Sequence, residues 1–277
     1  MLCTTGAKVY MASRSKEKAE KTIQTLTSET PAPINRGSIH FLHLDLNDLI
    51  SVKKAAETFF QQESRLDILW NNAGSGAHII PFGARTVQNI ESVTGTICVA
   101  TLLFTTLLLP QLHAASPSRV VWTSSFLAEG ASPKNGINLT SLEKGIEDRT
   151  KNYAVAKAGT WTLGHEFARR YGREGITSVI QNPGNLKTGA YDAIGWVDML
   201  FLNPLLPEAR FGAYTELFAG FGSVGNGDYV VPWGRVRGDG ECPRKDLLEA
   251  IEPVEEGGLG YREKLWEWCE EKWKPYI

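Results

Sequence analysis

Apolar residues recur along the chain with two different periods. Apolar runs of strand length occur at 8–13, 39–44, 66–70, 119–123 and 177–181. Segments with the spacing of helices lie between or beside them, at 16–26, 52–62, 90–112 and 153–171. Strands that alternate with helices in this way predict a parallel sheet with helices on both faces. We therefore expect an α/β fold with a doubly wound parallel sheet.

Composition bears on the number of domains and on the partners. The 277 residues are 42% hydrophobic, and no Pro-, Gly- or Ser-rich linker divides them, so we expect one domain over residues 1–277. With 29 basic and 31 acidic side chains, the chain has no field to attract nucleic acid or an anionic membrane surface. The longest apolar run, 97–109, is too short to span a bilayer. We therefore expect small molecules, and neither nucleic acid nor a membrane, as the partners of this chain.

The cysteines bear on the compartment and on metals. The four cysteines are scattered along the chain without the paired spacing of a metal site. This pattern favours a reducing compartment, and we expect a cytoplasmic protein without a bound metal.

Polar side chains follow the predicted strands. Ligands of parallel sheets bind at the carboxyl ends of the strands, where the strand order reverses. The positions directly after successive strands hold Asp45, the Asn-Asn-Ala-Gly sequence of 71–74, the pair Ser124 and Ser125, and the loop 182–188. We expect the chemistry of the protein at these strand ends.

The helix at 153–171 begins with a tyrosine and a lysine four residues apart. This spacing places Tyr153 and Lys157 on one helix face, about one turn apart. A phenol has a pKa near 10, so it needs a nearby cation to exchange protons at neutral pH, and Lys157 could supply that charge. Ser125 could then hydrogen-bond a substrate carbonyl or alkoxide while Tyr153 gives or takes its proton. Each feature alone is common in surface helices or turns, but together they predict an acid–base site.

These motifs resemble the short-chain dehydrogenase/reductases, with their Rossmann-like fold, over essentially the whole chain, and most of all the retinol-dehydrogenase-like branch common in fungi. The resemblance rests on 71–74, on the Tyr153 and Lys157 pair, on Pro183-Gly184 with Thr188, and on the Trp-Glu-Trp-Cys-Glu-Glu tail of 266–271. It implies an NAD(P)-dependent oxidoreductase acting between an alcohol and a ketone. It also implies that Tyr153 is the general acid–base, that Lys157 lowers its pKa and holds the nicotinamide ribose, and that Ser125 orients the substrate oxygen.

The resemblance also implies a set of cofactor-binding residues. Arg14 matches a position whose guanidinium meets a 2′-phosphate, which favours NADP over NAD; the alternative is a solvated arginine at a helix start. Asp45 matches a residue beside the adenine, and Asn72 one near the adenine ribose. Leu186 and Thr188 match the loop that contacts the nicotinamide amide.

The substrate is indicated by one segment. The resemblance places a substrate-covering segment at about 189–210, and residues 194–206 within it are largely apolar. This favours a lipophilic ketone or alcohol, such as a polyketide or terpenoid, and a role in secondary metabolism. A core helix or a dimer-contact helix explains the same residues equally well, so self-association into a homo-oligomer stays open.

Two departures from the family pattern affect these expectations. The Thr-Gly-x-x-x-Gly-x-Gly turn and its strand are missing, and we expect the chain to begin inside the following helix, at Met1 to Cys3. That turn binds the pyrophosphate through backbone N–H groups, so either the true start lies upstream or the protein works without the usual dinucleotide site. At the second departure, Ile97 stands where the family usually has an asparagine that helps hold a water in the proton relay.

Two other functions therefore compete with the oxidoreductase. One is a cofactor-independent isomerase or lyase that uses the Ser/Tyr/Lys cluster for proton transfer. The other is a catalytically silent binding protein.

Overall fold

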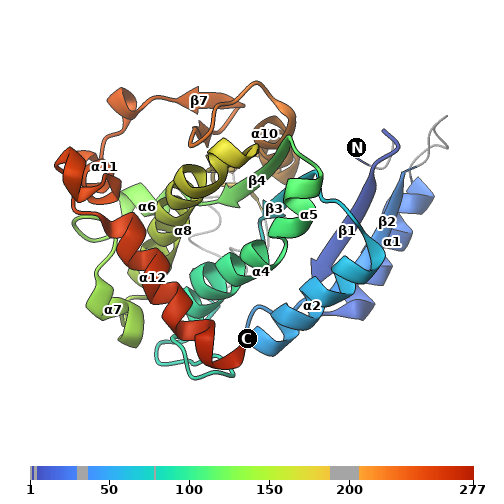
Figure 1. The fold of residues 1–277 in the computed structure, drawn as a ribbon, viewed down its shortest axis with the longest axis horizontal. Coiled ribbons are helices and arrows are strands. Elements are labelled where there is room, and N and C mark those ends of the chain that lie inside the picture. The colour runs from blue at the N-terminus through green and yellow to red at the C-terminus, as the bar shows by residue number, and fades with distance from the viewer. Residues whose placement is uncertain (1, 3–4, 30–36, 78, 188–205) are drawn as a thin grey trace.

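The computed structural model describes residues 2, 5–29, 37–77, 79–187 and 206–277, and strands and helices alternate through them (Figure 1). The strands are β1 (Lys8–Ser13), β2 (Ser38–His43), β3 (Ile68–Asn71), β4 (Ser118–Thr123), β5 (Ile176–Gln181), β6 (Tyr229–Val231) and β7 (Arg235–Arg237). The helices are α1 (Lys16–Glu29), α2 (Leu49–Gln62), α3 (Ser92–Thr94), α4 (Thr101–Leu107), α5 (Leu109–Ala114), α6 (Leu127–Gly130), α7 (Leu139–Lys144), α8 (Arg149–Tyr171), α10 (Ala209–Phe221), α11 (Lys245–Ile251) and α12 (Tyr261–Trp273). The five predicted strands are confirmed to within two residues.

The described strands form two sheets. β1 and β2 pair in parallel as one sheet, with Lys8 opposite Ser38. β3, β4, β5 and β6 run parallel in the other, and β7 closes its far edge in the antiparallel direction. The expected α/β architecture with parallel strands is confirmed, but among the described residues no strand is hydrogen-bonded between β1 and β3. Figure 1 shows β1 and β2, with α1 and α2, together at one side of the molecule.

One core nevertheless joins the two sheets. Leu42 of β2 and Val52 and Phe59 of α2 belong to the same buried cluster as Leu103 of α4. α2 lies directly against α4, so the first sheet is held to the second through helix packing. The side chain of Asp48 caps the start of α2 by accepting a hydrogen bond from the Ile50 amide.

The long predicted helix at 90–112 is broken into several pieces. It begins as α3, continues as a π-helix over Gly95–Ala100, and then becomes α4 and α5. α4 ends before Pro110, which lies in the first turn of α5, where its missing N–H costs nothing. The apolar period alone does not show this break, because nearly every residue from Gly95 to Thr105 is buried, whatever its side of the helix.

α8 is buried along most of its length and packs closely on the larger sheet. A Cβ atom at Gly164 would lie 2.5 Å from Cγ1 of Ile180 on β5 and 3.2 Å from Cδ1 of Trp122 on β4. Only glycine therefore allows this helix–sheet distance, which sets the height of Tyr153 and Lys157 above the strand ends.

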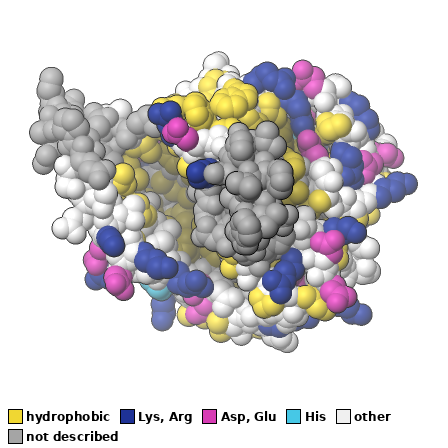
Figure 2. Space-filling view, turned by 180° about the vertical axis from the view of Figure 1, so that it is seen from behind, with side chains coloured by type: hydrophobic (Ala, Val, Ile, Leu, Met, Phe, Trp, Pro, Cys, Tyr) yellow, Lys and Arg dark blue, Asp and Glu magenta, His cyan; other side chains and the backbone are white. Residues whose placement is uncertain are grey.

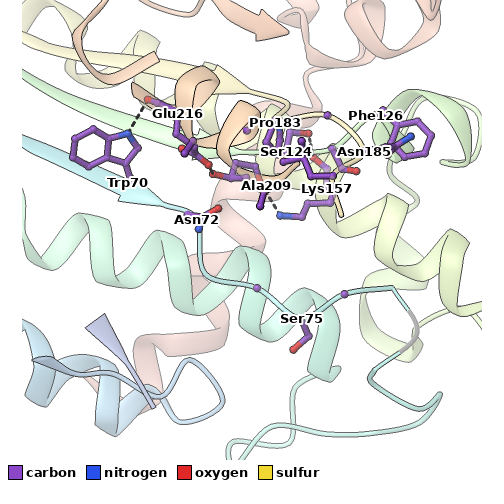
Figure 3. Close-up of a pocket in the computed structure, with 18 of the residues that line it drawn as sticks. Trp70, Asn72, Ser75, Ser124, Phe126, Lys157, Pro183, Asn185, Ala209 and Glu216 are labelled. Carbon is purple, nitrogen blue, oxygen red and sulfur yellow. Dashed lines mark hydrogen bonds between the residues drawn. The ribbon is translucent and has the colours of Figure 1, made fainter. Parts of the chain in front are cut away.

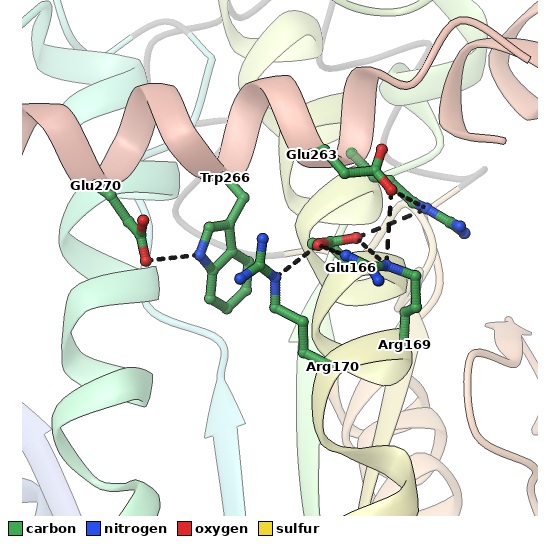
Figure 4. Close-up of polar contacts among 7 residues, drawn as sticks. Glu166, Arg169, Arg170, Glu263, Trp266 and Glu270 are labelled. Atoms are coloured by element: carbon green, nitrogen blue, oxygen red, sulfur yellow. Dashed lines mark hydrogen bonds and ion pairs between the residues drawn. The ribbon is translucent and has the colours of Figure 1, made fainter. Parts of the chain in front are cut away.

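α12 fixes the outer face of α8 through a buried carboxylate (Figure 4). Glu166 is fully buried, accepts hydrogen bonds from Nε of Arg169 at 2.9 Å and of Arg170 at 2.6 Å, and lies 3.6 Å from Nε of Arg262. The guanidinium of Arg170 lies 4.4 Å from the centre of the Trp266 ring. Three cations around one carboxylate satisfy its buried oxygens, so the C-terminal helix is anchored to the helix that carries the tyrosine and the lysine.

Candidate active site

A large cavity lies at the carboxyl ends of β3, β4 and β5. Its volume is about 870 Å³, and Trp70, Ser125, Tyr153 and Lys157 are among its lining residues. Val9, Met11 and Ile39 of the smaller sheet line it too, so the cavity reaches from one sheet to the other. Figure 2 shows hydrophobic side chains gathered in a hollow on this face of the molecule. The cavity offers a few polar groups on a largely apolar wall, as small-molecule sites do.

Tyr153 and Lys157 come from the first turns of α8. The side chain of Asp148 accepts hydrogen bonds from the amides of Thr150 and Lys151 and so caps the start of α8, as Asp48 caps the start of α2. Nζ of Lys157 lies 5.6 Å from the centre of the Tyr153 ring. The predicted pairing on one helix face is therefore present, and the cation faces the phenol ring.

Lys157 is almost fully buried. Its ammonium donates a hydrogen bond of 2.7 Å to the backbone oxygen of Thr123, the last residue of β4. Burial lowers the pKa of Lys157 to about 8, against the opposing effects of Cys98 and Glu216. At neutral pH the side chain is still mostly protonated, which is the state needed to stabilise a phenolate.

The two serines after β4 have different partners. The hydroxyl of Ser124 donates to the backbone oxygen of Lys157 at 2.9 Å and is buried, so it ties β4 to α8. The hydroxyl of Ser125 accepts from the Leu127 amide at 3.2 Å and is only half-buried. Ser125 is therefore the more accessible of the two serines, and its contact with a substrate stays a prediction.

The predicted cofactor residues divide into two groups. Asn72, which is exposed, and Leu186, which is half-buried, line the cavity together with Lys157. Arg14 is exposed just after β1, and Asp45 accepts a hydrogen bond from the Asn47 amide at 2.9 Å. Neither of these two is among the lining residues of the cavity.

Two further predictions concern the loop after β5. Thr188 and most of the expected substrate-covering segment at 189–210 lie outside the described residues. Its last part is described: Ala209 begins α10 and lines the cavity.

Ile97 and the ammonium of Lys157 both lie beside Gly74. A Cβ atom at Gly74 would be 3.8 Å from Cγ1 of Ile97 and 3.8 Å from Nζ of Lys157, so both side chains border the same point. Ile97 is buried in the π-helix. An apolar side chain thus faces the region where the family pattern places an amide.

Sequence reasoning missed Glu216, a buried acid on α10. The residue lines the cavity, and its Oε1 accepts a hydrogen bond from the Thr123 hydroxyl at 3.1 Å (Figure 3). The same oxygen accepts a hydrogen bond from Nε2 of Gln181 at 2.6 Å. Its backbone oxygen accepts from the indole of Trp70 at 3.1 Å. Burial raises the pKa of Glu216 to about 7, and Thr123, Lys157 and Gln181 oppose the rise. The available signal was a lone acid in the apolar stretch 211–221.

A Gly-x-Gly-x-x-Gly sequence at 220–225 has a packing role. It begins in the last turn of α10 instead of preceding a helix, so no helix N-terminus follows it to bind phosphate. A Cβ at Gly220 would lie 2.3 Å from Cζ2 of Trp70, which explains the glycine by close packing.

The described part of the chain, residues 2, 5–29, 37–77, 79–187 and 206–277, shows neither a metal centre nor a membrane-spanning helix. No three His, Cys, Asp or Glu side chains are grouped there as metal ligands would be. None of the helices in these ranges is long and apolar enough to cross a membrane.

The chain is thus an α/β protein whose parallel strands end at a cavity lined by Ser125, Tyr153 and Lys157, and comparison with known proteins identifies its family. The family sequence model described as "short chain dehydrogenase" matches residues 1–195. The short-chain dehydrogenase/reductase iacJ of Pestalotiopsis fici is 44% identical over 288 residues, covering 100% of this chain and 85% of the relative. A short-chain dehydrogenase/reductase of Phomopsis amygdali is 38% identical over 296 residues, with the same two coverages.

Solved structures agree with this fold. An uncharacterized protein from Mycobacterium paratuberculosis has a TM-score of 0.70 at 26% identity, covering 98% of this chain and 85% of that one. The RhlG/NADP complex of Pseudomonas aeruginosa has a TM-score of 0.64 at 20% identity, covering 83% and 86%. The chain therefore belongs to the short-chain dehydrogenase/reductase family of oxidoreductases, and the resemblance predicted from the sequence is confirmed at that level.

Proposed function

We propose that the chain is an NADP-dependent oxidoreductase that transfers a hydride between nicotinamide and a lipophilic ketone or alcohol, with Ser125, Tyr153 and Lys157 as its catalytic residues. The observation that carries the proposal is the shared cavity: Tyr153 and Lys157, from one face of α8, and Ser125, after β4, line the same largely apolar cavity. The nicotinamide, when bound, supplies or accepts the hydride.

In this proposal the chain's own residues handle the proton and the substrate oxygen. For reduction, Tyr153 donates its phenolic proton to the oxygen that becomes an alcohol, and for oxidation it removes that proton. Lys157, held on the Thr123 carbonyl, stabilises the phenolate left behind. The Ser125 hydroxyl donates a hydrogen bond to the substrate oxygen and keeps it within reach of Tyr153.

The residues present fit one end of the cofactor better than the other. Lys157 and Leu186 line the cavity where the nicotinamide and its ribose would be held, and Asn72 lines it nearby. The wall formed by Val9, Met11 and Ile39 offers aliphatic side chains and no charged donor for a pyrophosphate. Arg14 is the residue that we assign to the 2′-phosphate, as an exposed cation directly after β1. Two proteins of the same fold are described as NADP or NADPH complexes, RhlG and a carbonyl reductase from chicken fatty liver.

The apolar lining of the cavity also bears on the substrate class. Apolar surface covers most of the cavity, so a lipophilic carbonyl compound would bury its body there and leave one oxygen for Ser125 and Tyr153. We assign the chain to the retinol-dehydrogenase-like branch, with a role in secondary metabolism in the cytoplasm, on the sequence resemblance.

A second candidate is a cofactor-independent isomerase or lyase. The aliphatic wall of β1 and β2 favours it, because such an enzyme needs the acid–base pair but no phosphate site. A catalytically silent binding protein would hold a ligand in the same cavity without proton or hydride transfer.

The test is consumption of NADPH, followed by its absorbance, with a panel of lipophilic ketones, and NADH in a parallel series. We expect saturable, ketone-dependent oxidation of NADPH. Conversion of a substrate without added nucleotide would instead support the isomerase or lyase, and tight ligand binding without any turnover would support the binding protein.

A further inference from the structure

Two buried side chains of opposite charge share Thr123. The ammonium of Lys157 donates to its backbone oxygen at 2.7 Å, and its hydroxyl donates to Oε1 of Glu216 at 3.1 Å. Lys157 comes from α8 and Glu216 from α10, so the end of β4 is held between a base and an acid from two different helices. Figure 3 shows both side chains at the same wall of the cavity.

The carboxylate is held firmly in this position. Gln181 of β5 donates to the same Oε1 at 2.6 Å and to the Thr123 hydroxyl at 2.9 Å, which closes a three-membered polar ring at the ends of β4 and β5. Oε2 of Glu216 is buried and has no hydrogen-bond partner among the residues that the structure describes, so there the group is arranged around a single oxygen. A buried carboxyl group with half its acceptors unused is costly as a mere structural element, and this points to a role for its charge.

Burial disfavours the protonated form of Lys157, so a negative charge nearby would stabilise its ammonium. Lys157 is nearly fully buried, and the apolar side chain of Ile97, from the π-helix, lies beside Gly74 as the ammonium does. Three titratable groups face it: Tyr153 from its own helix, Cys98 from the π-helix and Glu216 from α10. Burial raises the pKa of Cys98 to about 12, so that thiol is neutral at physiological pH and gives no counter-charge. Glu216 is the remaining acid among them.

We propose that Glu216 is a positioning residue for Lys157: anchored on Thr123 and Gln181, it supplies the counter-charge that keeps the buried ammonium protonated and held at the cavity wall. The charge pairing between Glu216 and Lys157 does not depend on the proposed oxidoreductase function, and only the catalytic consequence of this pairing rests on that function. In that case Glu216 acts on Tyr153 through Lys157 and does not touch the substrate.

The experiment follows the titration of Lys157 directly. Carbon-13-labelled lysine side chains are observed by NMR from about pH 6 to pH 10.5, and the Lys157 signal is assigned by its loss in Lys157→Met. In Glu216→Gln, which keeps the size and the acceptor oxygen, we expect the Lys157 titration midpoint to move down by about one pH unit, the lower end of the effect of a neighbouring opposite charge. Glu57→Gln removes an exposed acid of α2 and should leave the midpoint in place.

A reciprocal measurement guards against a poorly folded variant. Because the interaction between two charges is mutual, Lys157→Met should move the titration of the Glu216 carboxyl carbon up by a similar amount. If both midpoints stay where they are in the wild-type protein, the proposal is overturned. Neither measurement needs cofactor or substrate, so a failed activity assay does not decide it.

The catalytic consequence is a shift of the pH profile. Loss of the ammonium at a lower pH should move the alkaline limb of kcat/KM for ketone reduction down by about one unit in Glu216→Gln. A purely structural role would lower the whole profile without moving its limbs. If the Lys157 titration shifts but the alkaline limb does not, the charge pairing of Glu216 with Lys157 is supported. That result would argue against the proposed catalytic use of Lys157.

Discussion

Lys157 donates its hydrogen bond to the backbone oxygen of Thr123 and not to a side chain, at a distance of 2.7 Å. A main-chain acceptor at the end of a central strand cannot rotate away, so the ammonium is held in place before any ligand arrives. Its position 5.6 Å from the centre of the Tyr153 ring is therefore a property of the fold. Such preorganisation is what acid–base catalysis by a phenol requires.

Replacement of Tyr153 by phenylalanine tests the acid–base role. The ring and its packing remain while the exchangeable proton is lost, so ketone reduction should fall by roughly 10²- to 10⁴-fold. Thermal unfolding should barely change. Steady-state rates with NADPH and a melting curve measure the two quantities, and near-full turnover of the phenylalanine variant would show that Tyr153 is only a packing residue.

Arg14→Ala tests the preference for NADP. If the guanidinium meets the 2′-phosphate, the variant loses a charge-assisted hydrogen bond worth roughly 1.5–3 kcal/mol, or about 10- to 150-fold in the dissociation constant of NADPH. The affinity for NADH should hardly change. Fluorescence titration with both nucleotides measures this, and Arg173→Ala, an exposed arginine after α8, is the control. Equal losses for both nucleotides would refute the assignment.

Glu216→Gln should change how stability depends on pH. The pKa of Glu216 is raised on folding from 4.5 to about 7, so the stability that this group contributes is present below its unfolded pKa and is lost as the pH rises through the folded value. Between about pH 5 and pH 8 the wild-type protein should lose roughly 3 kcal/mol relative to the glutamine variant, at about 1.4 kcal/mol per unit of pKa. Urea unfolding across this range measures the difference. Parallel curves for the two proteins would mean that Glu216 titrates as in the unfolded chain.

Gly164→Ala tests the close contact of α8 with the sheet. The added methyl group would stand 2.5 Å from Cγ1 of Ile180, so we expect a loss of about 1–3 kcal/mol in the free energy of unfolding. Ile180→Val removes a methyl group at the contact and should restore part of that loss in the double variant. Gly238→Ala, at a site with open space and an ordinary φ of −74°, is the matched control. An alanine variant as stable as wild type would mean that the helix can move outward freely.

The sequence predicts those parts of the fold that leave a local pattern. The five runs that become β1 to β5 are each four to six residues long, and the spacing of Tyr153 and Lys157 is that of one helix turn. β6 and β7 are three residues each, and they are strands because they add to the edge of β5, which no local period records. The sequence pattern does not reveal the break of the helix at 90–112 either, since the π-helix and the start of α4 are buried at nearly every residue.

The residues of the site also differ in whether a local sequence pattern predicts them. Ser125, Asn72 and Leu186 follow strands, and the rule that ligands bind at strand ends placed them at the cavity. Glu216 comes from a helix more than 90 residues beyond Thr123, so only the packing of α10 on the sheet brings them together. Arg14 was assigned by resemblance alone and Asp45 by resemblance and by its place after a strand, and neither residue lines the cavity.

The division of the strands into two sheets has a consequence for cooperativity. β1, β2, α1 and α2 are joined to the rest of the described chain by packing of α2 on α4 and by hydrogen bonds of Val87 and Gln88 to the start of α2, and no backbone ladder crosses from β1 to β3. Elements joined in this way can open as a unit at a lower free energy than global unfolding, so the amides of β1 should exchange with solvent faster than those of β4. A ligand that fills the cavity touches Met11 on one sheet and Trp70 on the other, and its binding would slow exchange in β1 by tying the two units into a single cooperative one.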